Sequence, residues 1–200
     1  MSVIVALTGG IASGKTLASS CMAKAGIAII DADVVARSVV AKGSETLLTL
    51  VKKFGRQILT ADGSLDRATL KKIVFNDPIK LNLLNQITHP RIQSEIKTQL
   101  VHIKSVFVVL VIPLLNIHML KTYEINRVLV VDVDSDVQRQ RVMVRDQTDV
   151  EMANKVIASQ IDRKERLILA DDIIVNNGTK LEFQAKVTQV VKFYQCMGSY

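Results

Sequence analysis

A glycine-rich segment near the beginning of the sequence has the residue types and spacing of a phosphate-binding loop. Gly9-Gly10-Ile11-Ala12-Ser13-Gly14-Lys15-Thr16 satisfies the Walker A pattern Gly-x4-Gly-Lys-Thr. Glycines let such a loop turn tightly and aim its N–H groups inward, and a helix that follows the loop adds partial positive charge. We therefore expect residues 9–17, Leu17 included, to bind ATP, with Lys15 at the β- and γ-phosphates and the Thr16 hydroxyl on Mg²⁺.

Two aspartates, Asp31 and Asp33, close the apolar run that begins at Ile27. Ligands of open parallel sheets bind at the carboxyl ends of strands, and residues two apart on an extended chain share a face. Both carboxylates are therefore expected near the mouth of the phosphate loop. One could take the proton of an attacking hydroxyl, and the other could hold Mg²⁺ through water. Asp33 could equally cap a helix that begins at Val34, and spacing alone does not decide.

Arginines recur after the fourth apolar run in a pattern that suits phosphate binding. Gln138, Arg141 and Arg145 share one face of an expected helix, and Arg163 and Arg166 follow beyond a polar break at residues 146–149. Guanidinium groups bind phosphates through two parallel hydrogen bonds and can neutralise charge on a transferring phosphoryl group. Two arginine-bearing helices joined by a polar hinge suggest a mobile lid that excludes water. A solvated face paired with acidic residues is the alternative.

Three further groups of residues are less specific. The loop Asn176-Asn177-Gly178 ends an apolar run, so Asn177 could contact adenine, or the loop could be a simple turn. Asp132 ends another run, as a Walker B aspartate would, although capping the next helix is at least as plausible. His89, which precedes Pro90, is expected to be structural rather than catalytic.

The elements that would position these residues alternate between two types. Apolar runs that predict buried parallel strands cover Val3–Thr8, Ile27–Asp31, Val106–Ile112, Val128–Asp132 and Asp172–Val175. Helical patterns lie between them, so we predict an α/β fold in which helices cover both faces of a five-stranded parallel sheet.

The second and third strands are separated by a long helical stretch. It reads as the helices Val34–Ala41, Ser44–Phe54, Asp66–Phe75 and Pro78–Lys104, and the His89-Pro90 step favours a break in the last of them. We expect residues 33–104 to form an acceptor subdomain and residues 137–166 to form the lid. Residues 1–32, 105–136 and 167–200 would form the core, with a final helix from Lys180 to Met197.

Composition and charge narrow the class of protein. The chain of 200 residues is 48% hydrophobic, carries a net charge of +7, and spreads its basic residues without a long run, which suits phosphorylated small molecules better than nucleic acid. No apolar run is long enough to span a membrane, and no basic segment precedes the first one, so a signal peptide is not expected. Cys21 and Cys196 form no metal or redox spacing, which suits the cytosol. A monomer or weak oligomer is expected.

With these residues in hand, the chain resembles the bacterial dephospho-coenzyme A kinase family over nearly its whole length. The ordered set of matching segments comprises Leu7-Thr8-Gly9-Gly10-Ile11-x-Ser13-Gly14-Lys15, Asp31-Ala32-Asp33, Phe54-Gly55, Asp62-Gly63-x-Leu65-Asp66-Arg67, His89-Pro90, Pro113-Leu114-Leu115, Arg127-Val128-x-Val130-Val131-Asp132, Gln138-x-x-Arg141-x-x-x-Arg145-Asp146, Gln160-x-x-Arg163-x-x-Arg166, and Ala170-Asp171-Asp172-x-Ile174-x-Asn176. A Walker A segment alone is compatible with many functions, whereas this ordered set is far more specific.

The resemblance implies an adenylate-kinase-like core, acceptor domain and lid. It also implies that ATP, with Mg²⁺, phosphorylates the ribose 3′-hydroxyl of dephospho-coenzyme A, the last step of coenzyme A biosynthesis. The general base then falls on Asp33 and phosphate contacts on Lys15 and Arg141. Thr8 matches a position near the acceptor, and His89 joins Thr8, Asp33 and Arg141 as a candidate substrate contact. Asp31 remains for Mg²⁺ through water, and Arg145 and Asn177 remain for ATP.

The sequence departs from the family pattern at a few positions. Ala12 and Leu17 stand where the family often has glycine and threonine, and Ala12 does not adopt a positive φ easily. Asn116 and Ile117 stand where the family usually has an apolar residue and a glutamate, so this chain lacks that glutamate.

Two other functions compete with this interpretation. Another P-loop kinase would act on a nucleotide, a nucleoside or a shikimate-like alcohol. A GTPase-type module would need a guanine-reading Asn/Thr-Lys-x-Asp motif, and Thr179-Lys180-Leu181-Glu182 lacks the aspartate.

Overall fold

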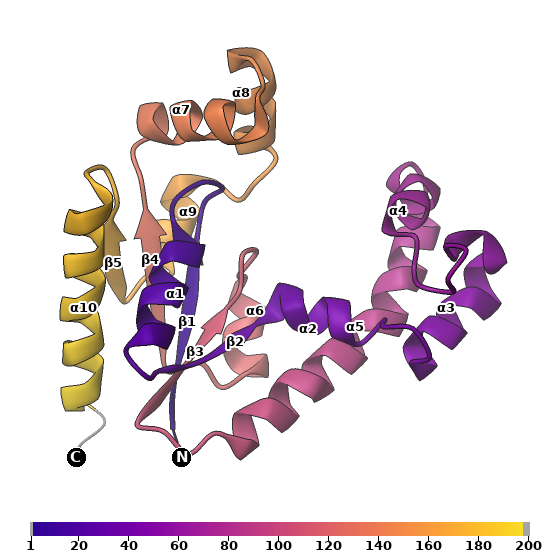
Figure 1. The fold of residues 1–200 in the computed structure, drawn as a ribbon, viewed down its shortest axis with the longest axis horizontal. Coiled ribbons are helices and arrows are strands. Elements are labelled where there is room, and N and C mark those ends of the chain that lie inside the picture. Colours follow the sequence, from indigo (N-terminus) through magenta and orange to yellow (C-terminus); the bar gives the residue numbers. More distant parts are fainter. Residues whose placement is uncertain (1, 198–200) are drawn as a thin grey trace. The chain divides into compact units, whose positions relative to one another are not determined.

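The computed structural model describes residues 2–197, which divide into two compact units. One unit comprises Met1–Asp31 and His102–Tyr200, and the other comprises Ala32–Val101. The ribbon in Figure 1 labels their helices and strands.

The first unit is built on a parallel sheet of five strands. The strands are β1 (Val3–Gly9), β2 (Ala28–Asp31), β3 (Phe107–Val111), β4 (Arg127–Asp132) and β5 (Asp172–Val175). They lie in the order β2-β3-β1-β4-β5, and every neighbouring pair is parallel. The predicted parallel sheet is confirmed, and the central position of β1 puts the phosphate loop at the middle of its carboxyl edge.

Both faces of the central strands are buried, which explains why their sequences are apolar without alternation. Val5, Leu7 and Val109 belong to one core cluster, whereas Ala6 and Leu110 face the other way and are equally inaccessible. The first face is covered by α1 (Lys15–Lys24) and α10 (Lys180–Met197), which contribute residues to the same cluster. The predicted final helix is confirmed from its first residue to its last.

Four further helices belong to the first unit within the described residues. They are α6 (Ile117–Thr122), α7 (Ser135–Asp146), α8 (Val150–Ala158) and α9 (Arg163–Ile168). The expected break after α7 is present, because Gln147 adopts the left-handed conformation at φ 50° and the Asp149 side chain caps α8. Helix α6 was not expected from the sequence. Asn116, one of the residues that depart from the family pattern, caps this helix by accepting a hydrogen bond from the Met119 N–H at 3.2 Å.

The second unit is helical and has its own core. Its elements are α2 (Ala32–Ser38), α3 (Glu45–Phe54), the 3-10 helix η1 (Arg56–Ile58), α4 (Arg67–Phe75) and α5 (Pro78–His102), of which the last residue belongs to the first unit. The side chains of Ser44 and Asp66 accept hydrogen bonds from backbone N–H groups three residues later and so cap α3 and α4. Leu50, Phe54 and Ile58 pack with residues of α4 and the start of α5.

The break expected at His89-Pro90 is wrong, because α5 continues through Pro90. A proline inside a helix removes one backbone hydrogen bond and costs about 3 kcal/mol. Leu83, Leu84 and Ile87 pack against the core of the unit before the proline, and Ile96 is fully buried after it. This burial stabilises the helix on both sides of Pro90 and offsets the cost of the proline. The burial depends on tertiary contacts, which a local sequence pattern does not show.

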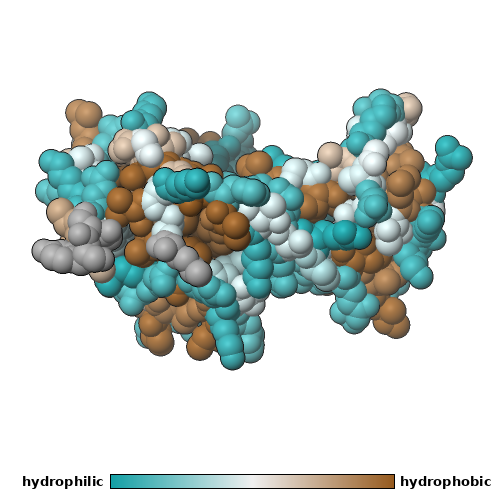
Figure 2. All heavy atoms as spheres, turned by 90° about the horizontal axis from the view of Figure 1, so that it is seen from below, coloured by the Kyte–Doolittle hydropathy of each residue, from teal (hydrophilic) through white to brown (hydrophobic). Residues whose placement is uncertain are grey.

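The surface is mixed in character. Figure 2 shows hydrophilic side chains interspersed with separate groups of hydrophobic ones on one face of the molecule. Both units have exposed large apolar residues, for example Phe75, Ile79 and Val144. No helix within residues 2–197 combines the length and apolar character that crossing a membrane requires.

Candidate active site

The phosphate loop connects β1, which ends at Gly9, to α1, which begins at Lys15. Gly14, the residue before the helix, has φ 108°, a conformation that favours glycine. No side chain among the described residues caps this helix end. The first-turn N–H groups of a helix have no partner within the helix, so this end is suited to receive an anion.

Ala12 takes the left-handed conformation at φ 55°, one of three residues other than glycine with positive φ among those described. The sequence identified this position as a departure, because alanine does not adopt a positive φ easily. The loop nevertheless has this conformation at Ala12, which costs about 1 kcal/mol of conformational free energy for a residue with a Cβ. Neighbouring contacts must therefore hold the loop in place.

The Lys15 side chain folds back over the loop. Its Nζ donates hydrogen bonds to the carbonyl oxygens of Gly9 at 2.7 Å and Gly10 at 2.8 Å. The ammonium group therefore lies at the Gly9–Gly10 end of the loop, where the Walker A lysine meets the β- and γ-phosphates.

Three amide side chains from distant segments hold the loop backbone. Gln160 accepts a hydrogen bond from the Ile11 N–H at 2.7 Å, and Gln138 donates one to the Ile11 carbonyl at 2.9 Å. The buried Asn176 donates to the Ser13 carbonyl at 2.7 Å. These bonds fix the backbone on both sides of Ala12, so the strained residue is held by its neighbours.

The loop presents polar groups that fit a Mg-nucleotide. The Ser13 hydroxyl is fully buried and has no hydrogen-bond partner among residues 2–197. Thr16 is exposed in the first turn of α1, so its hydroxyl is accessible to a metal ion. The described residues contain no cluster of three potential metal ligands. Mg²⁺ at phosphates takes only one or two protein oxygens, and Thr16 and Asp31 can supply them.

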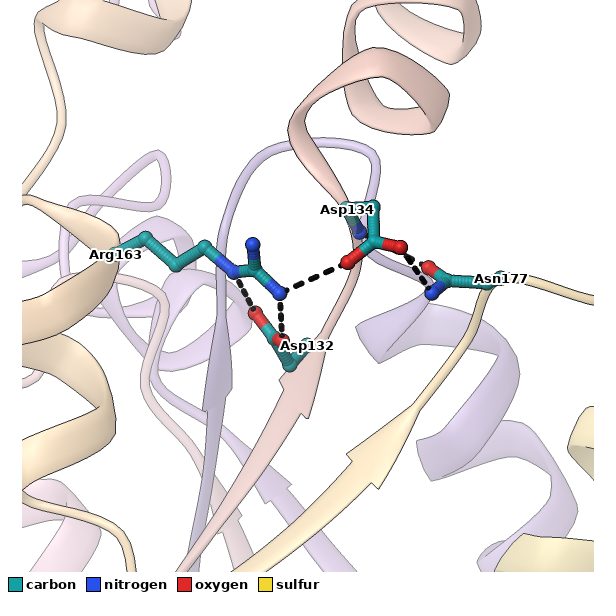
Figure 3. A network of polar contacts seen from close by, with 4 residues as sticks. All are labelled: Asp132, Asp134, Arg163 and Asn177. Carbon is teal, nitrogen blue, oxygen red and sulfur yellow. Dashed lines mark hydrogen bonds and ion pairs between the residues drawn. The ribbon is translucent and has the colours of Figure 1, made fainter.

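Asp132 is held by an arginine, so its expected role as a helix cap is wrong. Arg163 donates to both oxygens of Asp132, from Nε at 2.9 Å and from Nη2 at 2.6 Å, and Nη2 also reaches Asp134 at 3.0 Å (Figure 3). Asp134 occupies the N-cap position of α7, and Asn177 pairs with it through a side-chain donor at 2.7 Å. These two carboxylates raise the pKa of Arg163. Asp132 is therefore engaged by protein rather than presented to a metal ion.

The three polar residues of the predicted α7 face have different surroundings. Gln138 is buried against the loop, Arg141 is half-buried, and Arg145 pairs with its neighbour Asp146 at 2.7 Å. Within the described chain, no carboxylate lies within ion-pair distance of Arg141. Arg145 is thus paired with an acidic neighbour, whereas Arg141 has no ion-pair partner among the described residues.

Asp31 and Asp33 do not share an extended segment. Asp31 is the last residue of β2, whereas Asp33 lies in the first turn of α2, which begins at Ala32. The expectation that both point the same way by strand alternation is therefore wrong. The cap alternative also fails in the form expected, because the helix starts before Val34. Asp33 and His89 are both exposed and belong to the helical unit.

Thr8, the candidate acceptor contact, is buried at the end of β1. Its hydroxyl donates to the Pro113 carbonyl at 3.5 Å. Thr8 and Arg166 also line one small cavity, together with residues that follow β3.

Sequence reasoning missed the supports of the loop. Gln160 and Asn176 were named only as parts of matching segments, and Ser13 only as a loop position. Asn176 follows β5, which β4 separates from the loop strand β1, so its contact with the loop depends on the order of the strands in the sheet and not on a signal in the sequence. Gln160 lies 149 residues from its partner Ile11, and no local pattern connects them.

Known proteins match this chain over most of its length. A family model described as dephospho-CoA kinase matches residues 3–182. The dephospho-CoA kinase of Haemophilus ducreyi is 42% identical over 97% of this chain and 96% of its own, and that of Shewanella oneidensis is 45% identical over 88% and 85%. The solved structure of dephospho-CoA kinase from Campylobacter jejuni superposes with a TM-score of 0.69 at 28% identity and covers 96% of each chain. The matched residues include the phosphate loop, the helical unit and helices α7 to α9.

Proposed function

The chain belongs to the dephospho-CoA kinase family, which phosphorylates dephospho-coenzyme A with ATP in the last step of coenzyme A biosynthesis, and we propose how its residues divide this reaction. The observation that carries the proposal is the phosphate loop, with its uncapped helix end and the Lys15 ammonium group held over its first two carbonyls. This arrangement is suited to a triphosphate whose terminal group lies near Gly10.

ATP is bound by the loop and by the charges that surround it. Backbone N–H groups from Ala12 to Leu17 cradle the phosphates, and Lys15 exchanges its carbonyl partners for the β- and γ-phosphates. Thr16 would hold Mg²⁺ directly and Asp31 would hold it through water, and the bound ion would supply positive charge beside the phosphates. Arg145 and the Asn177 backbone complete the nucleotide contacts.

The acceptor is activated by Asp33. This carboxylate takes the proton of the ribose 3′-hydroxyl as that oxygen attacks the γ-phosphorus, and the β,γ-bridging bond breaks. Arg141 neutralises the charge that builds on the phosphoryl oxygens. Residues 33–104 bind dephospho-coenzyme A with help from Thr8 and His89, and residues 137–166 act as the lid that excludes water.

We further propose that the enzyme is cytosolic and works as a monomer or weak oligomer, without nucleic acid or membrane partners. Cys21 and Cys196 are both free thiols, which suits a reducing compartment.

The experiment is to incubate the protein with Mg-ATP and a panel of acceptors and to measure both ADP release and the phosphorylated product. We expect coenzyme A to form from dephospho-coenzyme A, with little turnover of AMP, nucleosides or shikimate. The variant Lys15→Ala controls for turnover that does not come from the phosphate loop. It should remain folded and lose most turnover, because removing one preorganised charge contact to the transition state costs roughly 3–4 kcal/mol. Turnover of shikimate or AMP alone would overturn the proposal.

A further inference from the structure

Helix α9 carries two arginines three residues apart whose surroundings are opposite. Arg163 is neutralised by Asp132 and Asp134, as Figure 3 shows. Arg166, by contrast, has no carboxylate within ion-pair distance among the described residues. Its only side-chain hydrogen bond in that part of the chain goes from Nη2 to the Ile161 carbonyl at 2.7 Å.

The Arg166 guanidinium is also partly removed from water. Burial lowers its pKa below the ordinary value for arginine, and the more distant charges of Asp132 and Asp162 offset only part of this effect. An arginine nevertheless stays charged at neutral pH. A desolvated charge without a counter-ion costs free energy, and binding an anion recovers that cost. Arg166 is thus an anion-binding group that the protein itself leaves unneutralised.

The position of Arg166 indicates which anion it meets. Its Nη1 lies 3.0 Å from where a Cβ on Gly10 would stand, so the guanidinium lies directly against the first residues of the phosphate loop. The Lys15 ammonium group occupies the same end through the Gly9 and Gly10 carbonyls. Because the Walker A lysine reaches the β- and γ-phosphates, this end of the loop is the γ-phosphate end.

The cavity that Arg166 lines is small and partly polar. It has a volume of about 10 Å³, and the Thr8 residue lines it as well. This is the space of about one water-sized atom. A single phosphoryl oxygen fits there, whereas a second organic group does not.

We propose that Arg166 is a further substrate-binding arginine of this kinase, one that contacts the γ-phosphoryl group of ATP at the Gly10 end of the loop. Arg163 is its structural counterpart, which ties Asp132 and Asp134 together and touches no substrate. The inference rests on the proposed ATP-binding role of the loop, but it does not depend on the identity of the acceptor. It also explains why residue 10 is glycine, since a side chain there would meet both Arg166 and Gln138.

The test compares the affinity for Mg-ADP with that for the Mg complex of the β,γ-imido analogue of ATP, by calorimetry and without any acceptor. Arg166→Ala should weaken binding of the analogue by about tenfold or more, the value of one charge-assisted contact, and change ADP binding by no more than about twofold. Lys164→Ala, which removes an exposed charge from the same helix, should leave both affinities unchanged. Arg166→Gln keeps an N–H donor for the Ile161 carbonyl without the charge and should behave as Arg166→Ala does.

Other outcomes are equally informative. If Arg166→Gln is folded by its melting temperature and binds both nucleotides as the unmodified protein does, the inference is wrong. Equal losses for ADP and the analogue would assign Arg166 to general support of the loop instead. The unmodified protein could also fail to phosphorylate dephospho-coenzyme A while Arg166→Ala still loses affinity for the analogue and not for ADP. The proposed acceptor would then be wrong, and the role of Arg166 would stand.

Discussion

The position of a side chain in this site depends on the element that carries it, as the two aspartates at the junction of β2 and α2 illustrate. Asp31 ends a strand that pairs with β3, so its position is set by the sheet. Asp33 lies within the first turn of α2, where the chain has entered the helical unit and the side chain is exposed. Asp33 therefore belongs to the helical unit, whereas Asp31 belongs to the carboxyl edge of the sheet.

The prediction that follows concerns the general base. Asp33→Asn keeps the shape of the side chain but removes its proton affinity, so kcat should fall by about 10²–10⁴ while ATP affinity is retained. Asp31→Asn is the matched variant and should instead weaken Mg-ATP binding. Both are measured by steady-state kinetics together with calorimetry. Normal turnover by Asp33→Asn, or an exchange of the two phenotypes, would contradict the assignment.

Arg141 is predicted to act on the transition state. Arg141→Lys keeps the positive charge but loses the planar fork, so kcat should fall by roughly tenfold or more while the KM for ATP changes little. Arg139→Lys is the control, because Arg139 is on the same helix and pairs with the exposed Asp136. An unchanged kcat with a raised ATP KM would indicate uniform binding of substrate and transition state instead.

Ala12 offers a test of strain in the loop. Ala12→Gly relieves the left-handed conformation but adds freedom to the unfolded chain, and the two effects nearly cancel. The free energy of unfolding in urea should therefore change by less than about 0.5 kcal/mol. Ala23→Gly on the exposed face of α1 has no such relief and should cost about 1 kcal/mol. Equal losses in the two variants would show that Ala12 is not strained.

At the scale of elements, the loop is positioned by side chains from distant segments that form hydrogen bonds to its backbone. Gln138 comes from α7 and Gln160 follows α8, and both bind the same residue, Ile11. Helix α7 and the segment that follows α8 are thus linked to the loop by hydrogen bonds. A movement of either one would be transmitted to the backbone next to Ala12.

This linkage predicts the effect of Gln160→Ala. The variant leaves the Ile11 N–H without its partner, which costs about 1 kcal/mol and loosens the loop. We expect the KM for ATP to rise and kcat to fall together, because ground-state and transition-state positioning both depend on the loop. Gln189→Ala, an exposed glutamine of α10, should match the unmodified enzyme. Kinetics of Gln160→Ala that equal those of Gln189→Ala would show that the hydrogen bond is dispensable.

At the scale of the whole molecule, stability toward acid depends on carboxylates that accept hydrogen bonds. Burial alone would raise the pKa of Asp172, but hydrogen bonds from Arg127 and Tyr194 more than offset it and lower the pKa. This cluster joins β4 and β5 to the C-terminal helix. In the helical unit, hydrogen bonds from Thr60 and Ser64 lower the pKa of Asp62 to about 2.

The sign of the pH dependence follows from these lowered values. A carboxylate with a lowered folded-state pKa stabilises the protein fully above its unfolded pKa, and this contribution is lost as pH falls through the folded pKa. The free energy of unfolding should therefore decrease below about pH 4. Asp172→Asn should be less stable than the unmodified protein at neutral pH, with a difference that shrinks as the solution becomes acidic. Asp136→Asn, at an exposed pair, should differ little at any pH. Thermal unfolding across this range is the measurement, and a difference for Asp172→Asn that does not change with pH would contradict it.

Much of the fold could be derived from the amino-acid sequence because its determinants are local. The apolar runs of the strands, the caps at Ser44 and Asp66, and the Walker A segment each lie within a few consecutive residues. The spacing of apolar residues and the residue types at the ends of each segment then specify a helix or a strand without reference to distant parts of the chain. For the same reason the parallel sheet, the final helix and the break after α7 agree with the expectation.

The three-dimensional structure was needed wherever a residue's role depends on a partner far along the chain. The sequence around Asp132 does not show whether this carboxylate binds a metal ion or an arginine. Its partner in the structure is Arg163, which lies 31 residues away along the chain. Pro90 remains helical because side chains pack on both sides of it. Arg163 has carboxylate partners and Arg166 has none among the described residues, a difference that only their tertiary neighbours make. Charge pairing and burial are properties of tertiary contacts, and the spacing of residues along a sequence does not contain them.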